Sequence, residues 1–143
     1  MSVTETADSV AAFCSAAQAN DIDGMACALA PDAELISPLS GRMVFRGHDD
    51  LRVLLGAAFG SLRDLRWREF AGKDQLHVAV SEARVAGLGI NDAMVIELDD
   101  DGRIRRIRPH LRPWAPLTVF ALQLGLKLAR HPGLIRRALQ QNQ

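Results

Sequence analysis

Apolar residues recur at a helical spacing in the first third of the chain and at nearly every second position through the middle. Polar residues at 4–9 can cap the first helix. Strand-like alternation begins at residue 33 and stops at Pro38, and it resumes after the third helix. The expected elements are helices at 10–17, 22–29, 51–59, 117–130 and 134–140, and strands at 33–37, 43–45, 62–71, 75–85, 90–98 and 103–112.

Helices followed by a hairpin-rich run of strands predict an α+β fold, because the chain has no alternating strand–helix–strand units. We expect a curved, mostly antiparallel sheet packed on the N-terminal helices, forming a cone whose wide end is a pocket. Residues 1–113 should form this domain. Residues 114–143 should form a C-terminal helical extension that packs on the domain or on a dimer partner.

The C-terminal extension is apolar on nearly all sides between residues 117 and 128, so most of its surface must be covered. Three roles are open: a lid over the cone, a dimer element, or a helix on a membrane surface. We favour packing on the body or on a partner, with membrane docking as the second choice. Some of Arg130, Arg136 and Arg137 should then lie near acidic groups of residues 1–101.

The formal charge is zero but unevenly distributed. Residues 1–101 hold all 17 acidic residues and eight basic ones, whereas residues 102–143 hold nine basic residues and no acidic one. Such asymmetry is compatible with nucleic-acid or membrane binding. Folding of the basic segment onto the acidic body is the simpler explanation, and no motif for reading nucleic acid is present, so we predict no nucleic-acid partner.

The N-terminus lacks the pattern of a signal peptide, and no apolar run reaches the roughly 20 residues that span a bilayer. Cys14 and Cys27 have no metal-ligand spacing and are predicted to be buried free thiols. These features favour a cytoplasmic protein. The sequence predicts no metal site and no cofactor.

Three short motifs occur in a familiar order. They are Asn20-Asp21-Ile22-Asp23-Gly24-Met25 with Leu29-Ala30-Pro31-Asp32-Ala33-Glu34-Leu35, then Phe45-Arg46-Gly47-His48-Asp49-Asp50-Leu51-Arg52, and then Asp100-Asp101-Gly102-Arg103-Ile104. Over roughly residues 4–112 the chain resembles the nuclear transport factor 2-like superfamily, in its polyketide-cyclase (SnoaL-like) branch. The resemblance implies a cone-shaped fold, a homodimer and a pocket for a small apolar molecule. Enzymes and non-catalytic binders share this fold, so function must come from the site.

The resemblance also implies where catalytic groups would stand. The ketosteroid isomerase base would fall on Ser37, its oxyanion-binding tyrosine on Phe13, and its protonated aspartate on Met94. The chain has no tyrosine, and a serine hydroxyl has no proton affinity suited to this reaction. An epoxide hydrolase aspartate would fall near Pro109. Neither set is complete, so neither mechanism is expected.

Asp92 is the main candidate for a reactive group. Alternation puts it on the same face as Ile90 and Met94, where an apolar pocket should raise its pKa or supply a partner. The neighbouring strand offers Ser81, Glu82 or Arg84, depending on the register. A pair with Arg84 could bind a ligand oxygen, and an ordinary strand-end salt bridge is the competing interpretation.

His110 is the second catalytic candidate, at the end of the last strand. Strict alternation turns it outward with Arg108 and Arg112, whereas a bulge at Pro109 would turn it inward. The other three histidines are expected at the surface. Phe13, Ser37, Trp67, Arg84, Met94 and Trp114 are candidate ligand-binding residues.

The sequence therefore predicts a pocket protein for a small apolar ligand, with Asp92 and His110 as proton-handling groups of a cyclase, isomerase or hydrolase. The alternative is a non-catalytic ligand-binding or interaction module.

Overall fold

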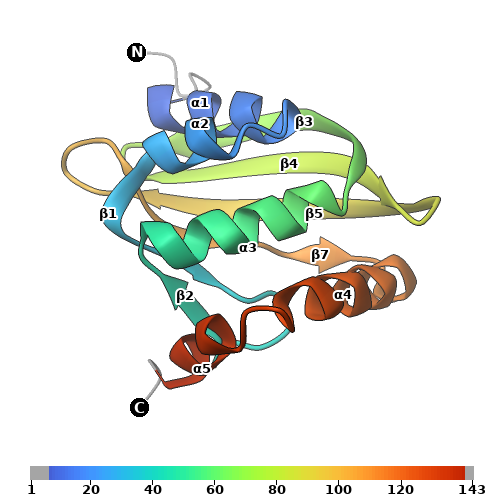
Figure 1. Ribbon diagram of the computed structural model, residues 1–143. Coiled ribbons are helices and arrows are strands. Elements are labelled where there is room, and N and C mark those ends of the chain that lie inside the picture. The colour runs from blue at the N-terminus through green and yellow to red at the C-terminus, as the bar shows by residue number, and fades with distance from the viewer. Residues whose placement is uncertain (1–6, 141–143) are drawn as a thin grey trace.

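The computed structural model describes residues 7–140, so part of the expected helix cap at residues 4–9 lies outside the described residues (Figure 1). Its helices are α1 (Asp8–Gln18), α2 (Ile22–Cys27), α3 (His48–Gly60), α4 (Trp114–Leu128) and α5 (Pro132–Gln140). Its strands are β1 (Leu29–Ile36), β2 (Val44–Arg46), β3 (Arg63–Lys73), β4 (Leu76–Val85), β5 (Leu88–Leu98), β6 (Ile104–Arg108) and β7 (Leu111–Arg112).

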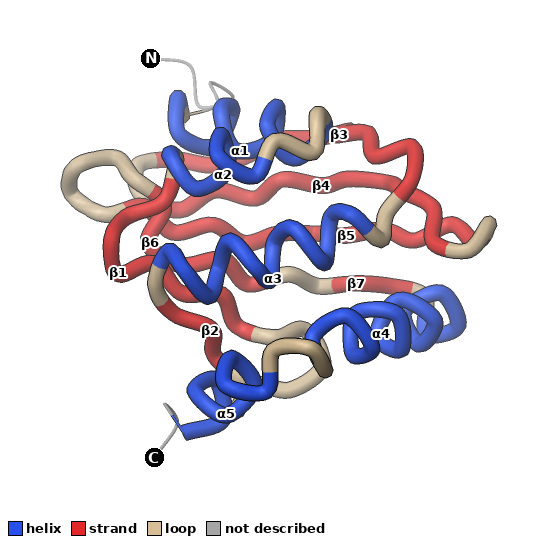
Figure 2. Tube along the Cα trace, in the orientation of Figure 1, coloured by secondary structure: helices blue, strands red, loops and turns tan. Residues whose placement is uncertain are grey.

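The strands of residues 7–140 form one curved sheet in the order β2-β1-β6-β5-β4-β3, with β7 also paired to β5 (Figure 2). Neighbouring strands are antiparallel except for β1 and β6, which run parallel. The helices lie together on one face of the sheet (Figure 1). This arrangement confirms the predicted α+β fold with a mostly antiparallel curved sheet and an added C-terminal helical segment.

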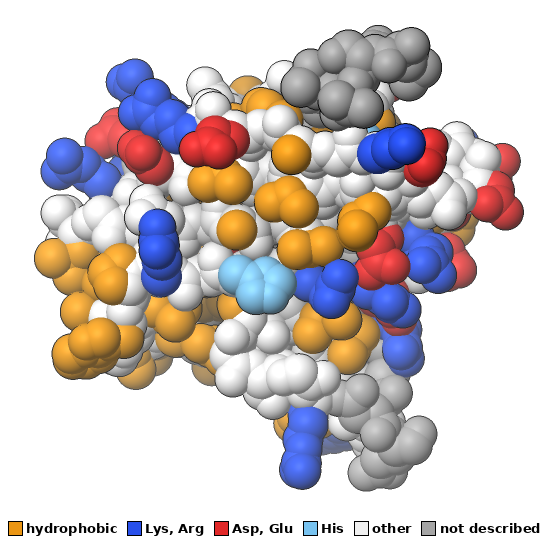
Figure 3. Space-filling view, turned by 180° about the vertical axis from the view of Figure 1, so that it is seen from behind, with side chains coloured by type: hydrophobic (Ala, Val, Ile, Leu, Met, Phe, Trp, Pro, Cys, Tyr) orange, Lys and Arg blue, Asp and Glu red, His pale blue; other side chains and the backbone are white. Residues whose placement is uncertain are grey.

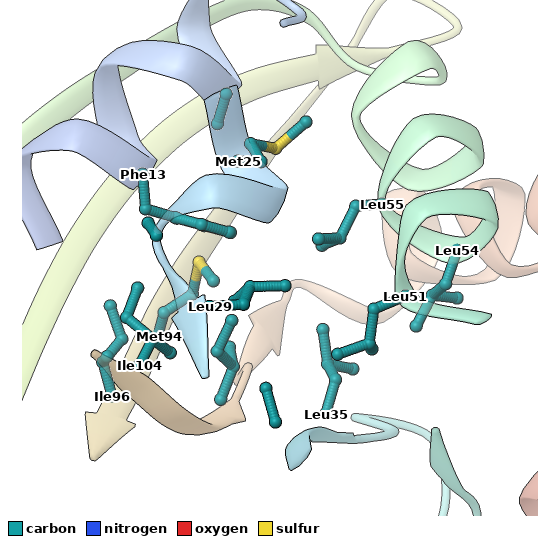
Figure 4. Packing of buried hydrophobic residues seen from close by; sticks show 14 of the residues in the cluster. Phe13, Met25, Leu29, Leu35, Leu51, Leu54, Leu55, Met94, Ile96 and Ile104 are labelled. Atoms are coloured by element: carbon teal, nitrogen blue, oxygen red, sulfur yellow. The ribbon is translucent and has the colours of Figure 1, made fainter. Parts of the chain in front are cut away.

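The hydrophobic core fills the space between this face of the sheet and α1, α2 and α3. Leu51 and Leu55 point from α3 toward β1, which carries Leu29 and Leu35 (Figure 4). Each fully buried side chain of this size contributes roughly 1.5–3 kcal/mol relative to exposure. α3 starts at the core because Gly47, with φ of 84°, makes the left-handed turn between β2 and the helix.

The C-terminal helices pack on the body of the same chain. Phe120 is buried in a cluster with Ala83, Val85 and Ile90, while Leu128, Leu134 and Ala138 belong to the main core. Arg137 binds both carboxylate oxygens of Asp50, at 2.6 and 2.9 Å, which confirms the predicted contact between this segment and the acidic part. The Nζ of Lys127 donates 2.8 Å to Ser61 Oγ and 3.3 Å to the Ala57 carbonyl, at the end of α3.

Other basic residues of the C-terminal third are paired on the outer surface of the sheet. Arg106 bridges Glu34 and Glu97, and Arg105 and Arg108 also contact Glu97. Burial alone would raise the pKa of Glu34, but hydrogen bonds from Arg46 and Arg106 lower it below its ordinary value. These ion pairs join basic residues of the C-terminal third to acidic residues of the rest of the chain, so they neutralise part of the uneven charge within the fold.

The prediction of buried free thiols is confirmed for Cys14 and wrong for Cys27. Cys14 is buried, and burial raises the pKa of its thiol to about 12. Cys27 is exposed, because the last turn of α2 points it away from the core. Among residues 7–140, no helix combines the length and the apolar character needed to cross a membrane.

Candidate functional site

A cavity of about 220 Å³ lies between α3, α4 and the concave face of the sheet. Its wall is almost wholly apolar, and Asp92 and Ser37 are the polar side chains among its described lining residues. The lining residues are Leu35, Ser37, Pro38, Leu39, Met43, Phe45, Leu54, Leu55, Ala58, Phe59, Leu62, Asp92, Met94, Pro109, Leu111, Leu117, Phe120, Ala121, Leu124, Gly125, Leu128 and Ile135. A largely apolar cavity with few polar groups is the usual form of a site for a small organic molecule.

Asp92 reaches this cavity through the alternation of β5. Ile90 and Met94, two residues away on either side, are buried on the concave face, so Asp92 shares that face with them. The register sets Asp92 opposite buried Ser81 of β4 on one side and opposite Leu111 of β7 on the other. The carboxylate is therefore held in the middle of three strands.

The surroundings of Asp92 disfavour its charged form. Burial raises its pKa from 3.8 to about 7, and the only opposing influence is the hydrogen bond that the His110 backbone N–H donates to its Oδ1 at 3.1 Å. Within residues 7–140 no lysine, arginine or histidine forms an ion pair with it. The interpretation of Asp92 as part of a strand-end salt bridge is therefore wrong. Asp92 is a carboxyl group that protonates near neutral pH.

No family model matches the chain, and no curated protein matches it either. Solved structures do match. An uncharacterized protein with a cystatin-like fold from Silicibacter pomeroyi has a TM-score of 0.86 at 17% identity, covering 93% of this chain and 95% of its own. A steroid delta-isomerase from Pseudomonas aeruginosa has a TM-score of 0.79 at 23% identity, covering 92% of this chain and 99% of its own.

A nuclear transport factor 2-like protein of unknown function from Burkholderia xenovorans has a TM-score of 0.66 at 19% identity, covering 73% of this chain and 80% of its own. The chain has the nuclear transport factor 2-like fold. At these identities the likeness establishes the architecture alone, and one fold of this kind supports unrelated functions. The function must therefore be inferred from the cavity and from Asp92, and not from the nuclear transport factor 2-like fold.

His110 lies outside the cavity of this nuclear transport factor 2-like fold. The register between β5 and β6 continues unchanged into β7, and Ala93 and His110 exchange two backbone hydrogen bonds of 3.0 Å. No bulge forms at Pro109. The His110 side chain is therefore exposed on the outer face, where its Nδ1 is 3.2 Å from the Ala93 carbonyl. The prediction that a bulge turns the His110 side chain inward is therefore wrong. Only the backbone N–H of His110 contacts Asp92.

The six candidate ligand-binding residues separate into two groups. Ser37 and Met94 line the cavity of the nuclear transport factor 2-like fold. Phe13 is instead fully buried and packs edge-on against Phe59, with ring centroids 6.2 Å apart. Trp67 donates its indole N–H to the Cys14 carbonyl at 2.9 Å and lines an outer depression beside α1. Neither residue lines the cavity.

Arg84 and Trp114 are also absent from the cavity. Arg84 is exposed between the buried residues Ala83 and Val85, so the alternation of β4 turns it to the outer face and rules out the Asp92–Arg84 pair. Trp114 is 78% exposed at the start of α4. The surface position expected for three histidines is wrong for His77, which is buried with its Nε2 3.1 Å from the Asp74 carbonyl.

Sequence reasoning left open whether α4 covers the cavity and did not name its residues as cavity wall. Leu117, Phe120, Ala121 and Leu124 come from this helix and close the space between α3 and the sheet. Its apolar character on nearly all sides was the available signal, since one side faces the cavity and another is exposed. Within residues 7–140 no group of three His, Cys, Asp or Glu side chains has an arrangement suited to a metal ion.

Proposed function

We propose that the protein binds a small, largely apolar molecule in its cavity and that Asp92 exchanges a proton with that molecule. The observation that carries the proposal is a carboxyl group in an almost wholly apolar cavity, with no ion pair to a described residue and with its pKa raised to about 7. Perturbed carboxyl groups in apolar clefts are typical of acid–base sites.

The size and polarity of the cavity limit the ligand. About 220 Å³ is less than the roughly 300–1,000 Å³ of pockets for drug-sized ligands, so the bound molecule should be small. One oxygen on the ligand, a carbonyl or a hydroxyl, would hydrogen-bond Asp92, because the His110 N–H occupies Oδ1 and the carboxyl group keeps further hydrogen-bonding capacity. The remainder of the ligand should be hydrocarbon, to match Leu, Met and Phe side chains.

A pKa near neutral suits general acid–base catalysis. At neutral pH both forms of Asp92 are populated, so it accepts a proton from an acidic C–H bond or donates one to a ligand oxygen. An isomerase or cyclase needs such a group. This site differs from the ketosteroid isomerase arrangement, because the position matched to its base is Ser37 and the position matched to its acid is Met94.

Binding without catalysis is the second candidate function, and the composition of the cavity favours it. Apart from Asp92, Ser37 is the polar side chain that lines the cavity, and while its Oγ accepts the Leu39 backbone N–H at 3.1 Å, its O–H is the single further side-chain donor among the described lining residues. Reactions that develop negative charge on a ligand oxygen usually rely on several preorganised donors.

Ligand binding is tested by a thermal-shift screen of small ketones, phenols and terpenoids. We expect a hit to stabilise the wild type, and Ala121→Phe, which fills the cavity wall, to abolish the shift. Ala115→Phe is the matched control, because Ala115 is exposed on the same helix and does not line the cavity. Equal shifts for wild type and Ala121→Phe would show that ligands bind elsewhere.

Proton exchange is tested by incubating each hit with protein in deuterium oxide and following its mass. Wild type should exchange or convert the ligand, and Asp92→Asn should do so about 10²–10⁴-fold more slowly while still binding it. A wild type that binds the ligand but neither exchanges nor converts it would establish the non-catalytic alternative.

A further inference from the structure

The side of α4 that faces away from the body is apolar along its length. Trp114, Leu122 and Leu126 are 78%, 65% and 74% exposed, and the exposed residues between them, such as Thr118 and Gly125, carry no charge. Leu139, on α5, is also largely exposed. Hydrophobic side chains gather at the lower left of Figure 3, over α4. We call this outward side of α4 and α5 the helical face.

Single exposed apolar residues are normal, but a cluster of them usually marks an interaction site. Of the seven large hydrophobic residues exposed within residues 7–140, four lie on the helical face. These helices already bury Phe120, Leu128 and Leu134 against the body, so the outward leucines are not needed for folding. The helical face therefore has the apolar composition of a surface that binds a partner.

Arginines without an ion pair to a described residue stand at both ends of α4 and on α5. Arg112 precedes α4, Arg130 follows it, and Arg136 lies on α5, and none of the three forms an ion pair with a described residue. All three are exposed. Residues 102–143 contain no acidic residue that could neutralise them. The basic residues that do form pairs, Arg105, Arg106, Arg108 and Arg137, lie against the acidic body.

We propose that the helical face docks on the surface of an anionic lipid bilayer. An apolar strip with Trp and Leu, flanked by arginines, is the pattern of a helix that lies in the membrane interface. The apolar side chains would enter the boundary between headgroups and acyl chains, while Arg112, Arg130 and Arg136 contact lipid phosphates. α4 and α5 lie in succession along the lower edge of the molecule (Figure 1).

Charge complementarity favours a bilayer over a second copy of the chain. Two helical faces meeting about a two-fold axis would bring the arginines of one copy against those of the other. Like charges brought together in this way oppose association, whereas anionic headgroups attract them. A second copy remains an outcome that the experiment distinguishes.

The helical face borders the opening of the cavity. Gly125 and Leu39 are exposed and also line the cavity, so the opening lies between α4 and the loop before β2. Docking would bring this opening to the acyl region, where apolar molecules concentrate. The docking proposal does not depend on any chemistry at Asp92.

The proposal is tested by sedimentation of the full chain with vesicles of phosphatidylglycerol mixed with phosphatidylcholine. We expect binding in low salt, no binding to pure phosphatidylcholine, and loss of binding in about 1 M salt, where the Debye length is about 3 Å. The double variant Leu122→Ser/Leu126→Ser should bind at least about tenfold more weakly, and Arg130→Gln/Arg136→Gln should lose a similar factor.

Two matched controls should leave vesicle binding unchanged. Leu76→Ser removes an exposed leucine from β4, and Arg103→Gln removes an exposed arginine from the turn before β6. Circular dichroism reports whether each variant is folded. Insertion is measured separately in a Trp67→Phe background, where Trp114 is the remaining tryptophan and its emission should shift to shorter wavelength with anionic vesicles.

Three results would overturn the proposal. They are absence of binding to anionic vesicles, equal binding by Leu122→Ser/Leu126→Ser, and an unchanged Trp114 spectrum. Light scattering identifies the other occupant. A wild-type dimer that becomes a monomer in Leu122→Ser/Leu126→Ser, with no vesicle binding, would assign the helical face to a second copy.

Discussion

Asp92 is the residue whose environment differs most from that of a free amino acid. In the folded chain its pKa is about 7, and on unfolding the pKa returns to 3.8. Between these values the folded state binds more proton than the unfolded state. The free energy of unfolding should therefore fall as pH rises from about 4 to about 7, and this contribution should stay level above pH 7.

Asp92→Asn should remove this pH dependence, because asparagine is neutral throughout and still offers an oxygen to the His110 N–H. We expect the variant to match the wild type near pH 4 and to be more stable by about 1–3 kcal/mol near pH 8. The effect should be smaller than ~1.4 kcal/mol for each unit of pKa difference, because the Asp92 side chain is partly exposed to water.

Urea unfolding at several pH values measures the difference between Asp92→Asn and wild type. Asp64→Asn is the control, because Asp64 is exposed and asparagine accepts its φ of 54°. A difference between Asp92→Asn and wild type that stays constant from about pH 4 to about pH 8 would contradict the raised pKa.

The sequence predicted which residues of β5 face the cavity, but it did not predict all the other residues that line it. Asp92 and Met94 could be predicted because alternation fixes the face of a strand once its core side is known. His110 was ambiguous, because a proline permits a bulge without requiring one. Phe13 and Trp114 were predicted to bind the ligand but do not line the cavity, since an apolar side chain suits core, cavity and surface cluster equally until the helices are packed.

α4 is the element with the most unusual composition. It carries Gly125 in its interior, and a Cβ added there would meet no atom within 4 Å. Gly125→Ala should raise the free energy of unfolding by about 0.5–1 kcal/mol, because alanine restricts the unfolded chain and favours the helix. Urea denaturation measures the change.

Gly72→Ala on β3 gives the opposite expectation. Its Cβ would lie 2.7 Å from the Cα of His77, so the backbone would have to move and stability should fall. A stability loss in Gly125→Ala comparable to that of Gly72→Ala would mean that α4 is not packed as described.

Among the elements, alternating strands were predicted best and the start of β1 worst. β1 begins at Leu29 rather than at the expected residue 33, and α2 ends at Cys27. The cause is that Leu29 and Ala30 are both buried, so the first residues of β1 show no alternation. The parallel pairing of β1 with β6 was not predicted either, because pairing between distant strands leaves no periodic signal in either one.

The whole molecule depends on its C-terminal helices for both core and cavity. A chain truncated after Pro113 would lose Phe120, Leu128, Leu134 and Ala138 from the core and would open the cavity to water. We expect this truncated chain to aggregate or to melt at a clearly lower temperature than the full-length chain. Ligands should no longer raise its melting temperature.

Size-exclusion chromatography and thermal unfolding measure these effects in the truncated chain. The full-length chain is the reference, and the same chromatogram tests the homodimer, which stays a prediction. Truncated protein that elutes as a single species and melts at the full-length temperature would refute a structural role for α4 and α5.

The position of β1 between β2 and β6 has a consequence for the chain as it is synthesised. With only β2 as a neighbour, β1 belongs to a two-stranded ribbon, which is marginal in water. Its parallel partner β6 begins at Ile104, and translation proceeds at about 5–20 residues per second. The nascent chain therefore holds the apolar side chains of β1 open for several seconds on the ribosome. The first strand to be synthesised is among the last to be enclosed.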